Sequence, residues 1–293
     1  MNQSKQLLSL ALALSAVSLS ACDDTETSNN AGVMTAGVEV TAGMTAGMPA
    51  GMTAGMTAGM TAGTEVTPPA PPVIPMVAPV DCAEQPCAVS VMQARSGDVV
   101  AADTLVSLSG VISATRTNAD GEISHIVVQA SEGGPLSGIW IYINDAQVEL
   151  PALAEGQRVE LTALTADRFG QRQLQKIEAL TVLGQEVAPL PLTLNPADIA
   201  TMGEYGAFLE GVLVAVEGVE VLELNPAPGT ADTDPNNEFV VTGGLRVNDY
   251  LTEFPSPVAL PAVGDRFSRI VGVLRFGNDD YKIEPRYAAD LTR

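Results

Sequence analysis

The sequence is poor in the residue types that most catalytic and metal sites use. Its 293 residues include one histidine, His125, and three cysteines. A structural zinc site needs four cysteine or histidine ligands, and metal-dependent phosphoesterases combine several histidines with acidic residues. No Gly-x-Ser-x-Gly, His-Glu-x-x-His or Gly-x-x-x-x-Gly-Lys-Ser/Thr motif is present. We therefore expect no catalytic residue, no metal site and no cofactor, and predict that the chain is not an enzyme.

Basic residues are also scarce. The chain has 35 acidic and 14 basic residues and a net charge of −21 at pH 7, and residues 81–293 alone carry a net charge of −17. Nucleic-acid affinity rests chiefly on lysine and arginine side chains that displace counterions from phosphates. The charge therefore disfavours nucleic acid as a partner, and it suits an exported domain that stays well solvated.

Residues 1–22 have the features of a lipoprotein signal peptide. Lys5 precedes an uncharged apolar stretch at 7–19, which is shorter than the roughly 20 residues of a membrane-spanning helix. The stretch ends in Leu19-Ser20-Ala21-Cys22, which resembles the lipobox of bacterial lipoproteins. We predict cleavage before Cys22 and lipidation of its thiol, for example with palmitate. Lipid then anchors the chain to a cell-envelope membrane, on the periplasmic or extracellular side. The alternative is an ordinary signal peptide with a chance cysteine.

The other two cysteines, Cys82 and Cys87, form a natural pair in an exported protein, where disulfides persist. A bridge between them closes a very short loop and removes little chain entropy. We therefore expect a disulfide that staples local structure.

Residues 23–80 are predicted to form a disordered linker. Met, Thr, Ala, Gly and Pro dominate the segment, and Met-Thr-Ala-Gly tetrads recur from Met34 to Met60. Glycine at every fourth position costs a helix about 1 kcal/mol each time, which argues against a helical stripe of methionines. The proline-rich end at 68–72 is typical of polyproline II, and we expect the segment to act as a tether.

The rest of the chain contains an internal duplication. Leu105–Val111 matches Leu213–Val219 at an offset of 108 positions. Further matches are Gly156 with Gly264, Arg158 with Arg266, and Phe169-Gly170 with Phe276-Gly277. Agreement in order and spacing predicts two copies of one fold, at 81–190 and 191–293.

Each copy is rich in strand patterns. The predicted strands are 105–115, 125–131, 138–144, 158–168 and 172–182 in the first copy, and 212–223, 238–242, 244–249, 266–276 and 280–285 in the second. The apolar alternation changes parity at Gly110 and at Gly218, as at a β-bulge that bends the first strand. Five strands, with a longer connection between the third and fourth, predict an all-β chain of two tandem five-stranded OB-fold-like barrels.

Several short motifs carry a family resemblance. They are Gly110-Val111, Gly218-Val219, Ser137 to Tyr142, Gly156 to Val159, Gly264 to Phe267, and Ile283 to Arg286. With them, the segment from Val91 to Arg293 resembles the tandem OB-fold modules of bacterial exported proteins, which often accompany secreted nuclease or phosphoesterase domains. The resemblance implies the OB fold and a non-catalytic role, because the nuclease chemistry of such proteins lies in a separate domain.

The third strand of the first copy carries candidate ligand-binding residues. Side chains alternate along a strand, so the isoleucines of 138–144 point to the core and Trp140 shares the outer face with Tyr142. OB barrels usually receive ligands on this face by stacking on aromatic rings. Packing of Trp140 under a loop or against the other barrel is the alternative. The second copy has Arg246 and Asn248 at the equivalent positions.

Basic residues near the predicted hairpins are further candidates. Arg168, Arg172 and Lys176 lie around the first hairpin, and Arg275 and Lys282 flank the second. They either bind an anionic polymer or solvate the hairpins. The oxygen-rich loop 230–238 is likewise either a weak Ca²⁺ site or a solvated turn. For His125 we expect a surface or strand-edge position.

The leading hypothesis is a non-catalytic, lipid-anchored binding or scaffold module of the bacterial cell envelope, with an envelope protein or polymer as ligand. Its candidate ligand face comprises Trp140, Tyr142, Arg168, Arg172 and Arg246. The alternative is an OB-fold nucleic-acid-binding accessory protein that works with an exported nuclease. A third possibility is a surface spacer without a ligand.

Overall fold

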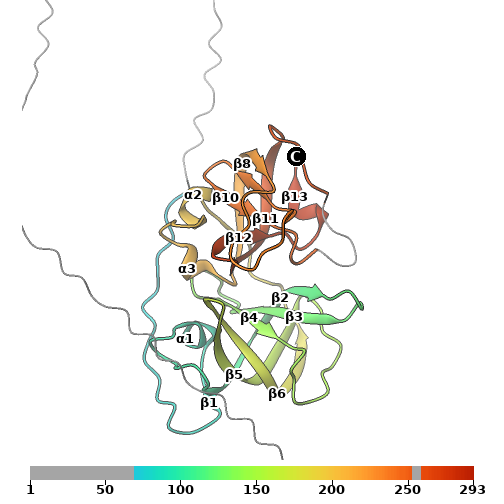
Figure 1. Cartoon of the computed structure of the whole chain (residues 1–293). Helices are drawn as coiled ribbons and strands as arrows, with labels where there is room; N and C mark the ends of the chain where they lie inside the picture. Colours follow the sequence, from blue (N-terminus) through green and yellow to red (C-terminus); the bar gives the residue numbers. More distant parts are fainter. Residues whose placement is uncertain (1–68, 253–258) are drawn as a thin grey trace, which may run out of the picture. The chain divides into compact units, whose positions relative to one another are not determined.

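The computed structural model describes residues 69–252 and 259–293 (Figure 1). The predicted signal peptide, the lipidation of Cys22 and the linker up to residue 68 lie outside the described residues and stay predictions. Residues 69–86 contain neither helix nor strand. Within the described part of the chain, no helix has the length and apolar composition that crossing a membrane requires.

Five strands close into a first barrel, barrel 1. They are β2 (Leu105–Thr117), β3 (Ile123–Gln129), β4 (Gly138–Tyr142), β5 (Gln157–Arg168) and β6 (Gln171–Gln185). The sheet order is β2-β3-β4-β6-β5, and β5 also pairs with β2, which closes the barrel. β4 pairs with β6 in parallel, and the other pairs are antiparallel. This connectivity is that of an OB-fold barrel.

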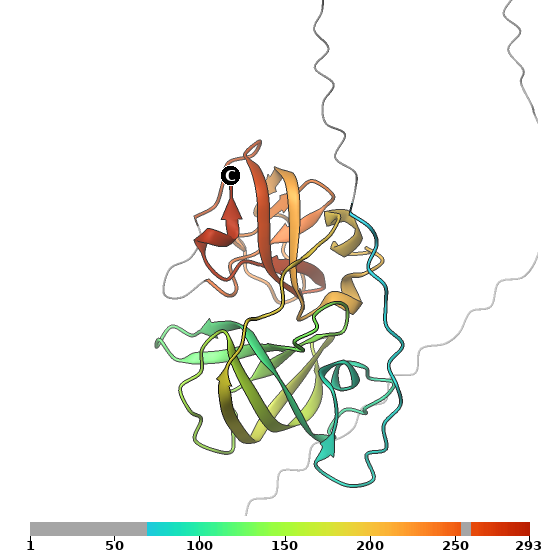
Figure 2. The same cartoon turned by 180° about the vertical axis from the view of Figure 1, so that it is seen from behind.

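A second barrel, barrel 2, repeats the arrangement. Its strands are β8 (Leu213–Leu224), β9 (Phe239–Val241), β10 (Leu245–Val247), β11 (Arg266–Gly277) and β12 (Asp280–Glu284). The order is β8-β9-β10-β12-β11 with β11 paired back to β8, and β13 (Leu291–Thr292) extends the sheet beside β11. Figure 2 shows both barrels from behind. The predicted all-β fold with two five-stranded barrels is confirmed.

The duplication extends to a short unit before each first strand, which the sequence patterns did not indicate. β1 (Cys87–Ala88) runs parallel to β2 and leads into α1 (Val91–Arg95), and β7 (Leu192–Thr193) runs parallel to β8 and leads into α2 (Pro196–Ile199). The side chains of Ser90 and Asn195 cap the two helices. Barrel 2 also has α3 (Gly206–Leu209) and the 3₁₀ helix η1 (Ala288–Asp290).

The predicted disulfide is present. Cys82 and Cys87 are joined with an S–S distance of 2.00 Å. Cys87 is also the first residue of β1 and belongs to the core of barrel 1. The bridge therefore fixes the chain at the point where it enters the barrel.

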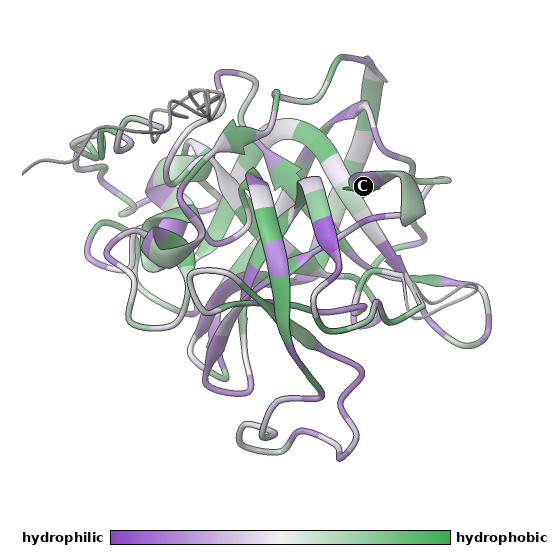
Figure 3. Ribbon diagram, turned by 90° about the horizontal axis from the view of Figure 1, so that it is seen from above, coloured by the Kyte–Doolittle hydropathy of each residue, from purple (hydrophilic) through white to green (hydrophobic). Residues whose placement is uncertain are grey.

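The strands alternate between core and surface side chains, as the changes between green and purple along the ribbons in Figure 3 illustrate. The predicted bulge at Gly110 is wrong, because Leu108 and Ile112 both face the core and the pairing of β2 with β3 shifts later, around Ser113. Gly110 serves close approach instead, since a Cβ there would lie 2.6 Å from Val128. The predicted change does occur at Gly218, which has a φ of 63°. Even-numbered residues of β8 face the core before this glycine, and odd-numbered residues face it afterwards.

The two barrels are parts of one compact unit and share a small apolar cluster. Its buried members are Ala114, Val127 and Trp140 from barrel 1 and Leu213, Leu251 and Val273 from barrel 2. A Cβ on Gly138 would overlap the carbonyl of Gly211, so the backbones meet directly there. Beside this contact, Arg95 pairs with the buried Glu210 at 3.2 Å. The barrels are therefore joined by a packed interface.

Candidate functional site

The outer faces of the two barrels correspond position by position. Strand pairing places Trp140 beside Gln173 in barrel 1 and Arg246 beside Lys282 in barrel 2. Trp140 therefore corresponds to Arg246, and Gln173 to Lys282. Steps of two residues along the strands add three further correspondences: Tyr142 with Asn248, Gln171 with Asp280, and Gln175 with Glu284. The two faces have the same geometry and different chemistry.

In barrel 2 this face is filled by a network of ion pairs. Lys282 is fully buried, contacts Glu238, and lies with Nζ 3.3 Å from Asp232 Oδ2. Arg246 pairs with Glu238 at 3.1 Å and with Asp280 at 3.0 Å. Arg246 was predicted as a ligand-binding residue, and in this structure its guanidinium is held by two carboxylates.

The loop between β8 and β9, residues 225–238, covers the same face. Asp232 belongs to this loop, and the carbonyl of Ala227 accepts a hydrogen bond from Arg246 Nη2 at 3.0 Å. The carbonyl of Thr230 accepts a further bond from Asn278 Nδ2 at 3.0 Å. The loop predicted as a solvated turn or a Ca²⁺ site therefore closes the face of its own barrel.

In barrel 1, half of the outer face packs against barrel 2. Trp140 is 1% exposed, and its ring centroid lies 6.1 Å from that of Tyr250. Its Nε1 lies 3.5 Å from the carbonyl oxygen of Leu274 in barrel 2. Trp140 therefore does not lie on an open ligand face. The alternative of packing against the other barrel is the one that the structure shows.

The other half of the face borders a cavity of about 270 Å³, which we call the glutamine groove. Three side chains of β6 line it: Gln171, Gln173 and Gln175. Tyr142 from β4 lies beside them, as predicted for the outer face, and is partly exposed. Burial raises the pKa of Glu210, and Arg95 and the Gln171 side chain oppose that shift. The Gln171 Nε2 is nevertheless buried without a well-aligned hydrogen-bond partner among the described residues.

The hairpin between β5 and β6 forms the rim of the groove. Its turn residues Phe169 and Gly170 both have positive φ, 52° and 79°. Two-residue hairpin turns of this kind favour asparagine, aspartate and glycine, and barrel 2 uses Asn278 and Asp279 there. Phe169 departs from that preference and is 91% exposed. An exposed aromatic ring is thus held at the edge of a polar groove.

The third wall comes from barrel 2. Tyr250 and Arg275 line the groove, and the Arg275 guanidinium lies 3.8 Å from the centre of the Tyr250 ring. Both are held by Glu284, which accepts a hydrogen bond from the Tyr250 backbone at 3.2 Å and pairs with Arg275 at 3.6 Å. The ion-pair network of barrel 2 therefore positions one wall of the groove in barrel 1.

His125, which we expected at the surface or at a strand edge, lies in β3 beside this wall, lines the groove and is partly buried. Its ring lies 5.1 Å from that of Tyr142 and 5.9 Å from that of Tyr250, and its Nδ1 is 3.1 Å from Ser124 Oγ. Burial, together with the positive charges of Arg116 and Arg275, lowers the pKa of His125 to about 4. The imidazole is therefore neutral at neutral pH.

Glu284 shows the opposite shift. Burial raises the pKa of this carboxyl to about 7, against the effect of the neighbouring Arg275 and Lys282. His125 lowers stability as the pH falls from 6.5 to 4, because the unfolded state binds the proton more readily. Glu284 raises stability as the pH falls from 7 to 4.5, because the folded state binds the proton more readily. The two contributions oppose each other.

We therefore expect His125→Gln and Glu284→Gln to change the pH dependence of stability in opposite directions. Relative to the unsubstituted chain, the His125→Gln variant should lose stability with rising pH between 4.5 and 6.5, by up to about 1.4 kcal/mol per pH unit. The Glu284→Gln variant should gain stability over that window by a similar amount. Urea unfolding at half-unit pH steps measures both, and parallel curves for all three proteins would contradict the shifts.

The remaining predicted basic residues differ in their availability. Arg172 is 6% exposed, pairs with Asp167 at 3.1 Å and donates to the carbonyl of Ala94 at 3.0 Å. Its assignment to the ligand face is wrong, because it ties the α1 segment to the barrel. Arg168 is exposed, lines the groove, and has no ion-pair partner among the described residues.

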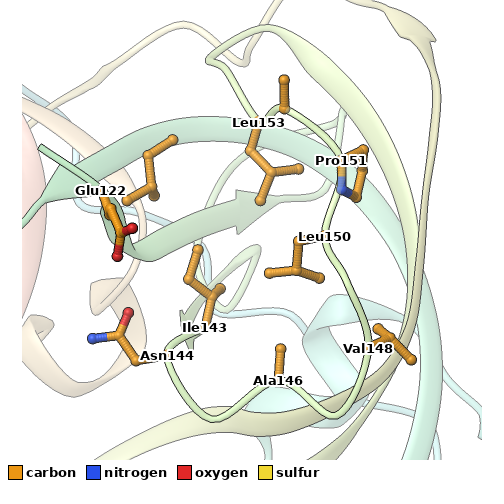
Figure 4. Close-up of a pocket in the computed structure, with 10 residues that line it drawn as sticks. Glu122, Ile143, Asn144, Ala146, Val148, Leu150, Pro151 and Leu153 are labelled. Atoms are coloured by element: carbon orange, nitrogen blue, oxygen red, sulfur yellow. The ribbon is translucent and has the colours of Figure 1, made fainter.

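A second hollow of about 590 Å³ lies at the end of barrel 1, under the loop that joins β4 to β5 (Figure 4). Apolar side chains dominate its lining, among them Ile143, Leu150 and Leu153. Leu150 and Leu153 also pack against the barrel core. With Glu122 and Asn144 as its polar side chains, the hollow offers a ligand fewer polar contacts than the glutamine groove.

Within residues 69–252 and 259–293, no three histidine, cysteine, aspartate or glutamate side chains are grouped so that they could hold a metal ion. The glutamine groove offers amides, aromatic rings, a neutral imidazole and the guanidinium of Arg168, for which the described residues supply no ion-pair partner.

Neither a protein-family model nor a curated protein matches the chain. Two solved structures align with parts of it. An OB domain from Methanosarcina mazei is 18% identical, and the match covers 30% of this chain and 77% of that domain at a TM-score of 0.23. A protein described as an aspartyl-tRNA synthetase from Leishmania major is 13% identical over 42% of this chain, at a TM-score of 0.25. The chain spans only 26% of that protein's length.

Proposed function

We propose that this chain is a non-catalytic, lipid-anchored binding module of the bacterial cell envelope, and that its ligand occupies the glutamine groove. One observation carries the proposal: of two equivalent barrel faces, one is closed by its own loop and ion pairs, and the other keeps unpaired polar groups. The lipobox-like sequence before Cys22 supports the anchor and the location.

Two properties of the groove support a binding role. Buried polar groups cost free energy when they lack partners, and the Nε2 of Gln171 is such a group. An aromatic residue in a left-handed turn is unfavourable, and such outliers cluster at functional sites. Phe169 combines that backbone with a fully presented ring at the rim. A ligand in the groove would satisfy the amide and cover the ring.

Site-specific photo-cross-linking in intact cells tests the proposal. With a photoreactive phenylalanine analogue at position 169, we expect a discrete cross-linked product that stays with the membrane fraction. The same analogue at Met202, which is 96% exposed on barrel 2, should give no such product. In a Cys22→Ser background, the cross-linked protein should leave the membrane fraction. Equal products from positions 169 and 202, or none from either, would contradict the proposed groove.

A further inference from the structure

The glutamine groove contains a row of amides with hydrogen-bonding capacity to spare. Gln171, Gln173 and Gln175 project from one face of β6, with roughly 6.6 Å between successive side chains. The side chains of Gln173 and Gln175 make no hydrogen bond to any described residue. Each amide offers two donors and an acceptor. Groups that both donate and accept, such as sugar hydroxyls, match such a row.

The lining of the groove also includes charged side chains. Residues 81–293 carry a net charge of −17, yet Arg168 stands at the groove without an ion-pair partner among the described residues. Arg275 also lines the groove but is paired with Glu284 at 3.6 Å. Asp145 is the one carboxylate in the lining. An anionic group on the ligand therefore has a defined partner, the Arg168 guanidinium.

The size and the aromatic rim narrow the ligand further. A cavity of about 270 Å³ is below the roughly 300–1,000 Å³ of pockets that enclose drug-sized molecules, so it suits one ring with its substituents. Phe169 and Tyr142 offer apolar faces to such a ring. A nucleic-acid strand would need further cations for its successive phosphates, and Arg275 is already engaged with Glu284.

We propose that the glutamine groove binds one acidic sugar residue of a polysaccharide. Gln173 and Gln175 hydrogen-bond its hydroxyls, Arg168 pairs with its carboxylate, and Phe169 stacks on its apolar face or on the next ring. This inference rests on the proposed binding function and gives it a ligand class.

The test compares two ligands that differ only in charge, by calorimetry with the full chain. The probes are an oligogalacturonate and the same oligomer with its carboxyl groups reduced to alcohols. We expect the acidic oligomer to bind about tenfold more tightly. Arg168→Gln should abolish this difference, whereas Lys176→Gln, the same charge change on the exposed Lys176 outside the groove, should preserve it. Gln173→Leu should weaken both oligomers equally.

Four outcomes would overturn the inference. Equal affinity for the two oligomers would show that the groove does not recognise the carboxylate of an acidic sugar. Tighter binding of an oligothymidylate, with an affinity that falls steeply with salt, would replace the sugar with nucleic acid. Binding of neither oligomer, while position 169 still cross-links in cells, would overturn the acidic-sugar inference and leave the binding function standing. Loss of the position-169 product as well would remove the binding function itself.

Discussion

Replacement of Trp140 by alanine should lower the free energy of unfolding by about 3–5 kcal/mol. The ring is 1% exposed and fills the space between the barrels, against Val127, Leu251 and Val273. Its loss leaves a cavity that the two rigid sheets cannot collapse into. Urea unfolding followed by circular dichroism measures the change, since the variant lacks the chain's one tryptophan.

Phe169→Ala is the matched control for Trp140→Ala. Phe169 is 91% exposed, so its truncation should change stability by no more than about 0.5 kcal/mol and should weaken ligand binding instead. In the unsubstituted chain, the emission of Trp140 should resist quenching by iodide until the protein unfolds. A stable Trp140→Ala variant with a readily quenched parent would show that Trp140 faces solvent, and would restore it as a ligand-stacking residue.

The second large effect concerns Lys282. We expect Lys282→Met to cost about 3–5 kcal/mol, because removal of one partner of a buried ion pair leaves an uncompensated charge. The carboxylates that lose this partner are Glu238, which is 1% exposed and keeps only Arg246 among the described residues, and Asp232 in the covering loop. The loop 225–238 should then exchange its amide hydrogens faster than in the unsubstituted chain. Urea unfolding and hydrogen exchange measure the two effects.

Two further variants separate the effect of burying the ion pairs from the effect of their charge. Arg266→Gln removes an exposed pair with Glu220, in which the Arg266 side chain is 81% exposed, and should cost less than about 1 kcal/mol. Adding Glu238→Gln to Lys282→Met should recover part of the loss, since it removes one of the buried negative charges in excess, while Arg246 keeps its pair with Asp280. A Lys282→Met variant as stable as Arg266→Gln would mean that the network contributes little to the closed face of barrel 2.

The fold was largely readable from the sequence, because strand patterns and the repeat are local signals. The duplication placed β2 with β8 and β5 with β11, and the strand lengths followed from alternation. The prediction of a bulge at Gly110 was wrong because a glycine there has a different cause. It leaves room for the close approach of Val128 on the neighbouring strand. The β1–α1 and β7–α2 units escaped notice because each is too short to carry a periodicity.

The site was only partly readable. The outer face of β4 and the rim residue Arg168 were predicted, and the alternation of Gln171, Gln173 and Gln175 along one strand was a signal that could have extended the prediction. Tyr250 gave no such signal, because it reaches the groove across the barrel interface. The burial of Trp140 and the ion pairs of Arg246 also depend on contacts between residues far apart in the sequence. Alternation within one strand cannot reveal such contacts.

The shared wall of the glutamine groove has a consequence for how this chain can evolve. Duplicated domains often remain interchangeable, so that one copy can be lost or recombined. Here one copy supplies the amides and the rim, and the other supplies Tyr250 and Arg275, oriented by Glu284. Under the proposed function, selection for ligand binding acts on residues of both copies at once. We therefore expect the two barrels to be inherited as a single module. Substitutions in the ion-pair network of barrel 2 are then limited to those that keep Tyr250 and Arg275 in place at the groove.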